Sequence, residues 1–341
     1  TFNPASIAVD NDVTLTMSAT QANGETITGA GTVIVKSLGA STNLANVNPT
    51  NLTLQLAGNI TYAGTFNTGP ALTFDTDSDG NARTVDITGA TNLPASIAVD
   101  DDVTVTLTAA QANTLTMTGA GSVIVESLGA STNLGSVSVA ALTLQLAGNV
   151  DFGGSVHGTP AITIDTNSDG TARTLDIVDA TFNPASIAVD NDVTLTMSHS
   201  QANAETITGA GSVTVTGTGA TSLNLSNVTA NIDISGVNSG GAITTLTYGT
   251  IGGSQTVTLT GAQASGKTIS GTGTTIVKSL GASSNLANVS TTNLTLQLAG
   301  NVDFEGSVHG TPAITIDTDS DGNARTLDIV DAVFNPASIA V

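Results

Sequence analysis

The chain lacks cysteine and tryptophan and has few basic residues. Without cysteine there are no disulfide bonds, thiolate metal ligands or cysteine nucleophiles, so stability must come from packing, backbone pairing or bound ions. Lys and Arg number 6 against 27 Asp and Glu, which gives a net charge of −21. This balance argues against binding to nucleic acid or to anionic lipid, both of which need clustered cations. Divalent cations are the natural counter-ions of such a chain.

Large apolar side chains and long apolar runs are also scarce. Aromatic residues make up 3% of the chain, with two Tyr and seven Phe. The core is therefore expected to be thin and built from Val, Ile, Leu and Ala, many of them β-branched and suited to strands. No apolar run approaches the ~20 residues that span a bilayer. No signal peptide is visible, so any export signal is expected outside these residues.

The chain consists of long tandem repeats. Residues 1–90 align without gaps with residues 91–180, so the period is 91 − 1 = 90 residues. A third copy begins at Thr181 and a fourth at Val333; because 333 − 181 = 152, the third copy carries 152 − 90 = 62 extra residues. We therefore divide the chain into repeats at 1–90, 91–180, 181–332 and 333–341. The last segment repeats the beginning of the chain, so we expect the array to continue in both directions.

Each copy has the pattern of strands rather than helices. Apolar and polar residues alternate, or short β-branched runs occur, in four segments of the first copy: Asp12–Met17, Thr32–Ser37, Asn51–Gly58 and Ala71–Asp77. Turn pairs such as Asn-Gly and Asp-Gly separate them, and no window has convincing helical spacing of apolar residues. The sequence predicts an all-β protein.

Two all-β architectures fit a 90-residue repeat. A parallel β-solenoid would divide it into about four coils of 22 or 23 residues, whereas a tandem β-sandwich would use one immunoglobulin-like module per repeat. The 62 extra residues favour the solenoid, because the phrase at 193–211 is replayed at 257–273 and a solenoid accepts whole additional coils. Against this, Asp79-Gly80 between alternating runs predicts an antiparallel hairpin. We predict a parallel β-solenoid, with the sandwich as the alternative.

The strongest chemical motif is an Asp-rich loop that occurs once per copy, DTDSDGNARTVD in the first. Alternate carboxylates, a Gly at the bend and a closing carboxylate offer the hard oxygen ligands that Ca²⁺ prefers. The candidate ligands at positions 1, 3, 5, 7 and 12 are Asp75, Asp77, Asp79, Asn81 and Asp86; Asp165, Asn167, Asp169, Thr171 and Asp176; and Asp317, Asp319, Asp321, Asn323 and Asp328. The loop resembles the EF-hand type of calcium loop, which implies Ca²⁺ as a cofactor.

The loop also departs from that type. Its twelfth residue is Asp rather than Glu, its ninth is Arg, and strands rather than helices flank it. The alternative is an Asp-Gly turn whose Arg pairs with a carboxylate. A second acidic triplet, Asp100 to Asp102 in the second copy, either adds calcium ligands between coils or forms a polar turn, and we favour the turn.

The remaining polar motifs indicate surface rather than chemistry. Thr-x-Thr pairs, such as Thr14 with Thr16, resemble the threonine ladders of ice-binding β-solenoids, but they recur once per copy, which favours an ordinary outward strand face. His157, His199 and His309 have no catalytic partners nearby in the sequence, and no G-x-S-x-G elbow occurs. Lys36, Glu126 and Lys278 share one repeat position, which indicates a tolerant solvated face. We expect no enzymatic activity.

The stretch from Thr106 to Val125, together with the Asp-rich loops, resembles repetitive bacterial cell-surface proteins: adhesins, haemagglutinin-like exoproteins and calcium-dependent surface-layer proteins. The resemblance implies an extracellular or cell-surface location and a structural role as a fibre, stalk or lattice segment stiffened by Ca²⁺. It also implies self-association, without nucleic acid and without membrane insertion. The alternative is an adhesin or binding module that recognises a glycan, a host surface or ice.

Overall fold

The computed structural model describes residues 4–76, 80–156, 160–166, 170–310, 312–318 and 323–341. The chain forms two compact units: residues 1–170 with 179–185 make unit 1, and residues 171–178 with 186–341 make unit 2. Within each unit, strands of successive coils pair in parallel, and every strand pair that the described residues show is parallel. The prediction of an all-β, parallel β-solenoid is confirmed, and the sandwich alternative is wrong.

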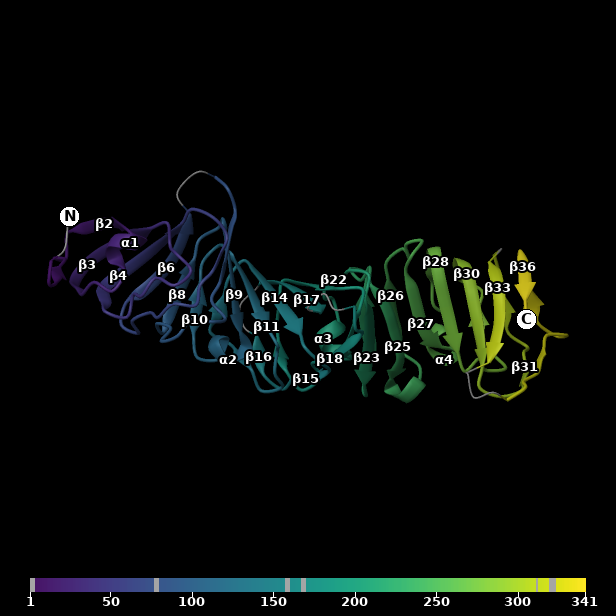
Figure 1. Ribbon diagram of the computed structural model, residues 1–341. Coiled ribbons are helices and arrows are strands. Elements are labelled where there is room, and N and C mark those ends of the chain that lie inside the picture. Colours follow the sequence, from purple (N-terminus) through teal and green to yellow (C-terminus); the bar gives the residue numbers. More distant parts are fainter. Residues whose placement is uncertain (1–3, 77–79, 157–159, 167–169, 311, 319–322) are drawn as a thin grey trace. The chain divides into compact units, whose positions relative to one another are not determined.

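Unit 1 contains three sheets, whose strands follow one another from coil to coil (Figure 1). Its first sheet has the order β1 (Ile7–Ala8), β3 (Ile27–Lys36), β4 (Val47–Leu56), β6 (Ala71–Thr76), β8 (Ser96–Val99), β10 (Thr116–Thr118) and β13 (Val137–Ser138), with β2 (Thr14–Ser18) also paired with β3. The second runs through β5 (Ile60–Thr61), β7 (Arg83–Asp86), β9 (Val103–Thr108), β11 (Ser122–Glu126), β14 (Ala141–Leu146) and β17 (Ala161–Thr166). The third contains β12 (Asn133–Leu134), β16 (Ser155–Val156) and β19 (Thr181–Phe182), and β15 is Val150–Asp151.

Unit 2 is built around one long sheet, which we call its main sheet. The order is β18 (Arg173–Asp176), β21 (Val193–Ser198), β23 (Ser212–Gly217), β25 (Asn231–Val237), β27 (Thr256–Thr260), β28 (Ile269–Lys278), β30 (Val289–Leu298), β33 (Ala313–Thr318) and β36 (Ser338–Ala340). The short strands form the sets β20 (Ser186–Val189) with β22 (Ile207–Thr208); β24 (Ser222–Leu225) with β26 (Thr245–Tyr248); β29 (Asn285–Leu286) with β32 (Ser307–Val308) and β35 (Val333–Phe334); and β31 (Val302–Asp303) with β34 (Leu327–Asp328). In Figure 1, β28, β30, β33 and β36 lie side by side in this order.

Short helices turn some of the corners. They are α1 (Ala19–Ala22), α2 (Ala109–Ala112), α3 (His199–Ala202), α4 (Gly261–Ala264) and the 3₁₀ turn η1 (Asn238–Gly240). Each α-helix begins with a capping box, in which a Ser or Thr hydroxyl accepts from the backbone of a Gln three residues later and the Gln side chain returns to the cap. No helix of the described residues is both long and apolar enough to cross a bilayer.

The coils vary in length, whereas nearly equal coils were predicted. Leu15 pairs with Val33, and Leu72 pairs with Ile97, so the second of these coils takes up more of the chain than the first. Four successive coils do not take up the same number of residues as one 90-residue repeat. Equivalent positions of two repeats therefore fall on different sides of the coil. Leu15 lies in the first sheet of unit 1, whereas Val105, its equivalent in the second repeat, pairs with β7 and β11 in the second sheet.

The core is the row of inward side chains that the parallel register stacks. In unit 1 Leu52, Leu72 and Ile97 are buried in consecutive coils, and the residues between them along each strand face outward. Each Val, Leu or Ile that is fully buried contributes roughly 1.5–3 kcal/mol relative to an exposed one. Small cores of this kind therefore gain stability by adding coils rather than by thickening.

The predicted hairpin at Asp79-Gly80 is wrong. Strand β6 pairs with β4 and β8, while β7 pairs with β5 and β9, so the two strands that flank the loop do not pair with each other. In a solenoid each strand is already hydrogen-bonded to the coils before and after it. The Asp-rich loop therefore turns a corner between two sheets.

The 62 extra residues form three whole coils. Val213 pairs with Ile232, Ile232 with Val257, and Val257 with Thr275. Because 275 − 213 = 62, these three steps take up all of the added residues. The insertion thus returns the chain to the same side of the coil, in register with the sequence that follows.

Two tyrosines with buried hydroxyl groups, the fully buried Tyr62 and the half-buried Tyr248, differ in their hydrogen bonding and offer a paired test. The Tyr62 hydroxyl donates to the Thr42 carbonyl oxygen at 2.7 Å, and burial raises the pKa of this side chain. Burial also raises the pKa of Tyr248, but its buried hydroxyl has no hydrogen-bond partner among the residues that the structure describes. We expect Tyr62→Phe to lower the free energy of unfolding by about 1 kcal/mol, because it removes a formed bond.

Tyr248→Phe is expected to raise the free energy of unfolding by about 1 kcal/mol, because it removes an unsatisfied polar group from the interior. Denaturant unfolding of both variants measures the two changes. Phe152 and Phe304 occupy the position of Tyr62 in the other copies, so the phenyl ring itself is tolerated there. A loss of stability in both variants would contradict the assignment of Tyr248 as unsatisfied.

Candidate functional site

The Asp-rich loops lie at corners between sheets. In unit 1 the first loop follows β6, in the first sheet, whereas the second follows β17, in the second sheet. Because a repeat does not complete a whole number of coils, these two loops do not stack on one side. Six candidate ligands lie outside the described residues: Asp77, Asp79, Asn167, Asp169, Asp319 and Asp321.

The first candidate ligand of each loop faces outward at the end of a strand. One oxygen of Asp75 accepts from its neighbour Thr76 N at 2.7 Å, and the other accepts from Gln55 Nε2 at 3.1 Å. Asp317 repeats this arrangement with Thr318 N at 2.8 Å and Gln297 Nε2 at 3.5 Å. The register places Gln145 beside Asp165 in the same way. A Gln of the preceding coil therefore stands beside the first Asp of every loop.

The coil that follows brings a second carboxylate to Asp75. Phe74 pairs with Val99, and the carboxyl groups of Asp75 and Asp100 share a hydrogen bond. Partial burial raises the pKa of Asp100, and the hydrogen bond and negative charge of Asp75 raise it further. Asp100 also forms the expected turn, because its carbonyl oxygen accepts from Val103 N at 3.0 Å. A turn residue of one repeat and a loop residue of the previous one thus make a carboxyl pair.

The Asp at the twelfth position of each motif, its closing Asp, lies away from the first Asp. Asp86 faces outward from β7, on another side of the coil from Asp75, so the structure does not bring these two carboxylates together. One Asp86 oxygen accepts from the backbone N of Thr88, at 2.9 Å. Asp176 and Asp328 make the same bond to the residue two positions later, at 2.9 and 3.0 Å.

The same local bond occurs inside a strand of the insertion. Asp233, in the insertion, accepts from Ser235 N at 2.8 Å, although no Asp-rich loop precedes it. The bond from an Asp carboxylate to the backbone N two residues later is therefore local and does not require an Asp-rich loop. Asn81, Thr171 and Asn323 lie in the loops, outside the strands. Among the described residues, no group of three or more His, Asp or Glu side chains is placed to hold a metal ion.

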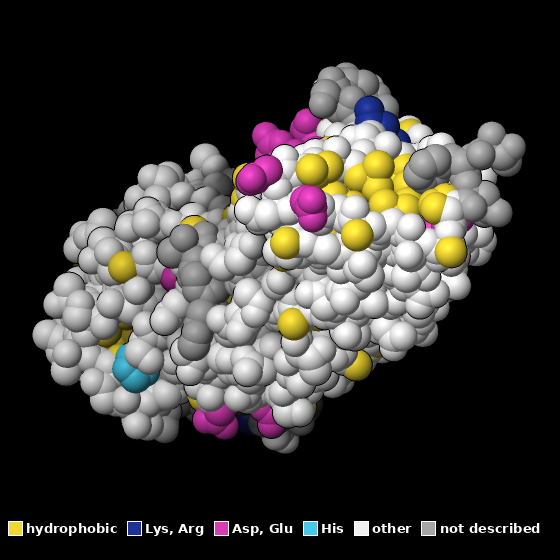
Figure 2. Space-filling view, turned by 90° about the vertical axis from the view of Figure 1, so that its left-hand side faces the viewer, with side chains coloured by type: hydrophobic (Ala, Val, Ile, Leu, Met, Phe, Trp, Pro, Cys, Tyr) yellow, Lys and Arg dark blue, Asp and Glu magenta, His cyan; other side chains and the backbone are white. Residues whose placement is uncertain are grey.

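The other polar motifs are distributed over the surface. His309 is exposed, His199 packs against Gly217 at a corner, and His157 lies outside the described residues. The Thr-x-Thr pairs of the first three copies lie at exposed or partly exposed positions, whereas Thr258 and Thr260 are buried. Neighbouring coils continue the columns with Ser, Thr, Asn, Asp and Ile. Neutral polar side chains and backbone dominate the face in Figure 2, where Asp and Glu gather in small groups.

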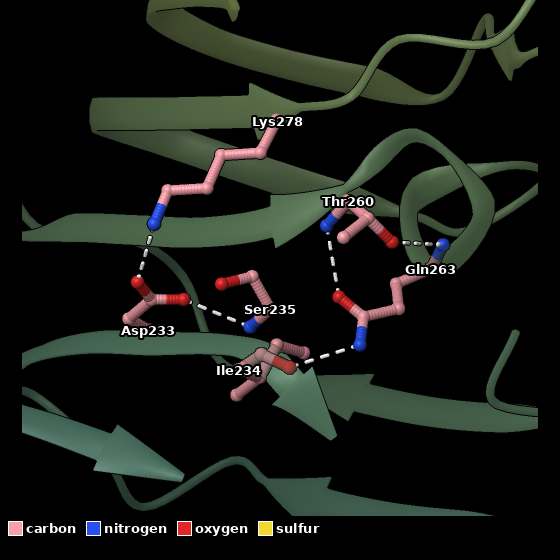
Figure 3. Close-up of polar contacts among 6 residues, drawn as sticks. All are labelled: Asp233, Ile234, Ser235, Thr260, Gln263 and Lys278. Atoms are coloured by element: carbon pink, nitrogen blue, oxygen red, sulfur yellow. Dashed lines mark hydrogen bonds and ion pairs between the residues drawn. The ribbon is translucent and has the colours of Figure 1, made fainter. Parts of the chain in front are cut away.

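One ion pair was missed by the sequence analysis. Lys278 Nζ lies 2.8 Å from Asp233 Oδ2, and both side chains are partly exposed (Figure 3). The two residues are 45 positions apart, and only the coil lengths bring them together. No sequence motif predicts this contact, because Lys36 and Glu126 occupy the position of Lys278 in the other copies.

Comparison with known proteins gives no relative: no family model, no curated protein and no solved structure matches the chain.

Proposed function

We propose that this chain is a structural repeat segment of a secreted or cell-surface protein, acting as part of a fibre, stalk or lattice and not as an enzyme. The observation that carries the proposal is the parallel pairing of strand after strand within each unit, by which coils are added without a new core. Because the chain has no cysteine, no disulfide can hold it together, and the excess of acid suits a protein that is held together by backbone pairing and cations. Self-association of copies belongs to the same proposal.

We further propose that Ca²⁺ binds at the Asp-rich loops. Support comes from the DxDxDG or DxNxDG pattern and from the Asp75–Asp100 pair, two carboxyl groups that repel each other when both are ionised. A divalent cation bound between them would relieve this repulsion. Asp86 is not among the residues that would hold the ion, because its carboxylate caps a corner on another side of the coil.

Calcium is expected to raise the melting temperature of the protein. A ligand present at 100 times its dissociation constant stabilises the folded state by about 2.7 kcal/mol per site. Differential scanning calorimetry at pH 7, with Ca²⁺ or with EGTA, measures the shift. Mg²⁺ serves as the ionic-strength control. An identical melting curve in Ca²⁺ and in EGTA would discard the metal from the proposal.

The Asp100→Asn variant tests whether the effect of Ca²⁺ on the melting temperature depends on the Asp75–Asp100 carboxyl pair. In EGTA at pH 7 the variant is expected to melt above the wild type, because the raised pKa of Asp100 means that its ionisation destabilises the fold. Stability from this group is present at low pH and lost as pH rises through its folded pKa, so the advantage of the variant should vanish in acid. Calcium should stabilise the variant less than the wild type, while Asp151→Asn, on β15, should leave the response unchanged.

A further inference from the structure

The insertion carries a polar hollow centred on β25, a strand without a counterpart in the first two repeats. The hollow has a volume of about 390 Å³ and lies on the outer face of the main sheet of unit 2, over β23, β25 and β27. Six polar side chains line it in two columns: Ser212, Asn231 and Thr256 in one, and Thr214, Asp233 and Thr258 in the other. Because β25 lies wholly within the added coils, this surface arose with the insertion.

A β-bulge shapes the hollow. Thr214 pairs with Asp233, but Thr216 pairs with Gly236, so β25 has one more residue than β23 over this stretch. Such bulges bend a strand and re-aim its side chains, and they are frequent beside binding sites. Gln263 is fully buried and donates from Nε2 to the carbonyl oxygen of Ile234 at 2.9 Å (Figure 3). It also donates to the carbonyl oxygen of Val237 at 3.0 Å. The hydrogen bonds of the buried Gln263 side chain therefore stabilise the bulge from the interior of the coil.

The bulge and the ion pair hold Asp233 in one orientation. Oδ1 accepts from Ser235 N at 2.8 Å, and Oδ2 accepts from Lys278 Nζ at 2.8 Å (Figure 3). Each carboxylate oxygen keeps a further lone pair for a ligand. Lys278 neutralises the charge, so the hollow is polar without being ionic. A fixed carboxylate of this kind is preorganised to accept hydrogen bonds from two adjacent hydroxyl groups.

The surrounding groups complete a set of hydrogen-bonding partners. Among the residues that the structure describes, none bonds the hydroxyls of Ser212, Thr214 or Thr256, and the amide oxygen of Asn231 accepts from Thr256 N at 2.8 Å, which leaves its NH₂ group available. Hydroxyl, amide and carboxylate groups on a partly exposed surface match the donors and acceptors of a sugar. The rungs of a parallel sheet are ~4.8 Å apart, a spacing close to the rise per hexose of an extended glycan.

We propose that this hollow binds a neutral polysaccharide through adjacent hydroxyl groups of its sugars, with Asp233 as the central acceptor and Ser212, Thr214, Asn231 and Thr256 around it. Polyanionic glycans are excluded by the net charge of −21 and by the carboxylate at the centre. The inference goes beyond a mechanical role, and it does not depend on calcium.

The test uses the full chain in EGTA, with mannan, galactan and β-glucan as neutral probes and polygalacturonate as the acidic probe. Biolayer interferometry is expected to show binding to at least one neutral polymer that is insensitive to salt. Asp233→Asn should weaken it tenfold or more, since one charge-assisted hydrogen bond is worth about 1.4 kcal/mol or more. Thr214→Ala combined with Thr256→Ala should weaken it as well.

The matched control is Asp86→Asn, which removes a carboxylate that makes the same bond to the backbone N two residues later but lies outside the hollow, and it should leave binding unchanged. Lys278→Glu creates the charge found at Glu126 in the second repeat and should abolish binding by leaving Asp233 without its counter-ion. Thermal melting of each variant verifies folding. The proposal is overturned if no neutral polymer binds, if polygalacturonate binds best, or if Asp233→Asn and Asp86→Asn behave alike.

Discussion

Replacing Gly119 with alanine is expected to unfold the coils around it. Gly119 has φ +122°, a conformation that residues with a side chain rarely adopt, and an added Cβ would clash with the carbonyl oxygen of Val99. The oxygen belongs to the backbone of the preceding coil, which is held by the parallel register and cannot move alone. Strain and overpacking together are expected to destabilise unit 1 by at least about 3 kcal/mol.

Denaturant unfolding followed by far-UV circular dichroism measures this effect. The control is Gly148→Ala, because a Cβ added at Gly148 would have no atom within 4 Å, and the change in stability should stay within about 0.5 kcal/mol. The same close approach recurs at Gly29, Gly209 and Gly271, so alanine there should reproduce the result. Equal stability of the Gly119 and Gly148 variants would show that the corner adapts.

Excision of residues 212–273 is expected to leave a folded protein that lacks three coils. The cut joins Gly211 to Thr274, which recreates the junction of the first repeat, where Gly31 is followed directly by Thr32. Because Val213 and Thr275 lie on the same side of the coil, three rungs apart, β28 would take the place of β23. Neighbouring coils contact only each other, so the loss of whole coils preserves every remaining interface.

A shorter excision supplies the contrast. Removal of residues 212–263 keeps the last ten residues of the insertion, which are too few for even the shortest coil and too many for a corner. The following strands would then lie on the wrong side, and unit 2 should lose cooperative unfolding. Calorimetry compares the two: a sharp transition is expected for the longer excision and a broad one for the shorter. Broad transitions in both would contradict the interpretation of the insertion as three whole coils.

Much of the architecture could be predicted because it depends on local alternation and on repetition. The alternating Leu and Thr of β4 and β6 indicated strands with one buried face, and the replayed phrase after Gly211 indicated coils. The hairpin at Asp79-Gly80 was predicted wrongly because the turn signal is the same for a hairpin and for a corner. In a hairpin the two strands that flank the turn pair with each other, whereas here each of them pairs with strands of the neighbouring coils.

The candidate site was less predictable. The spacing of the motif placed Asp75 and Asp86 together, yet a corner lies between them and their side chains leave different sides of the coil. The neighbour of Asp75 is instead Asp100, which belongs to the next repeat and was favoured as a plain turn residue. No sequence pattern predicted the ion pair of Asp233 with Lys278, since this contact depends on the lengths of the intervening coils.

By itself the sequence determined that the chain is all-β, repetitive, acidic and free of disulfide bonds, because composition and period are properties of the chain alone. Only the tertiary structure decided which outward side chains become neighbours. A short coil and a long coil look alike as strand patterns, but the sum of their lengths sets the side of the coil on which each residue emerges. The carboxyl pair of Asp75 with Asp100 and the polar hollow around Asp233 both follow from that sum.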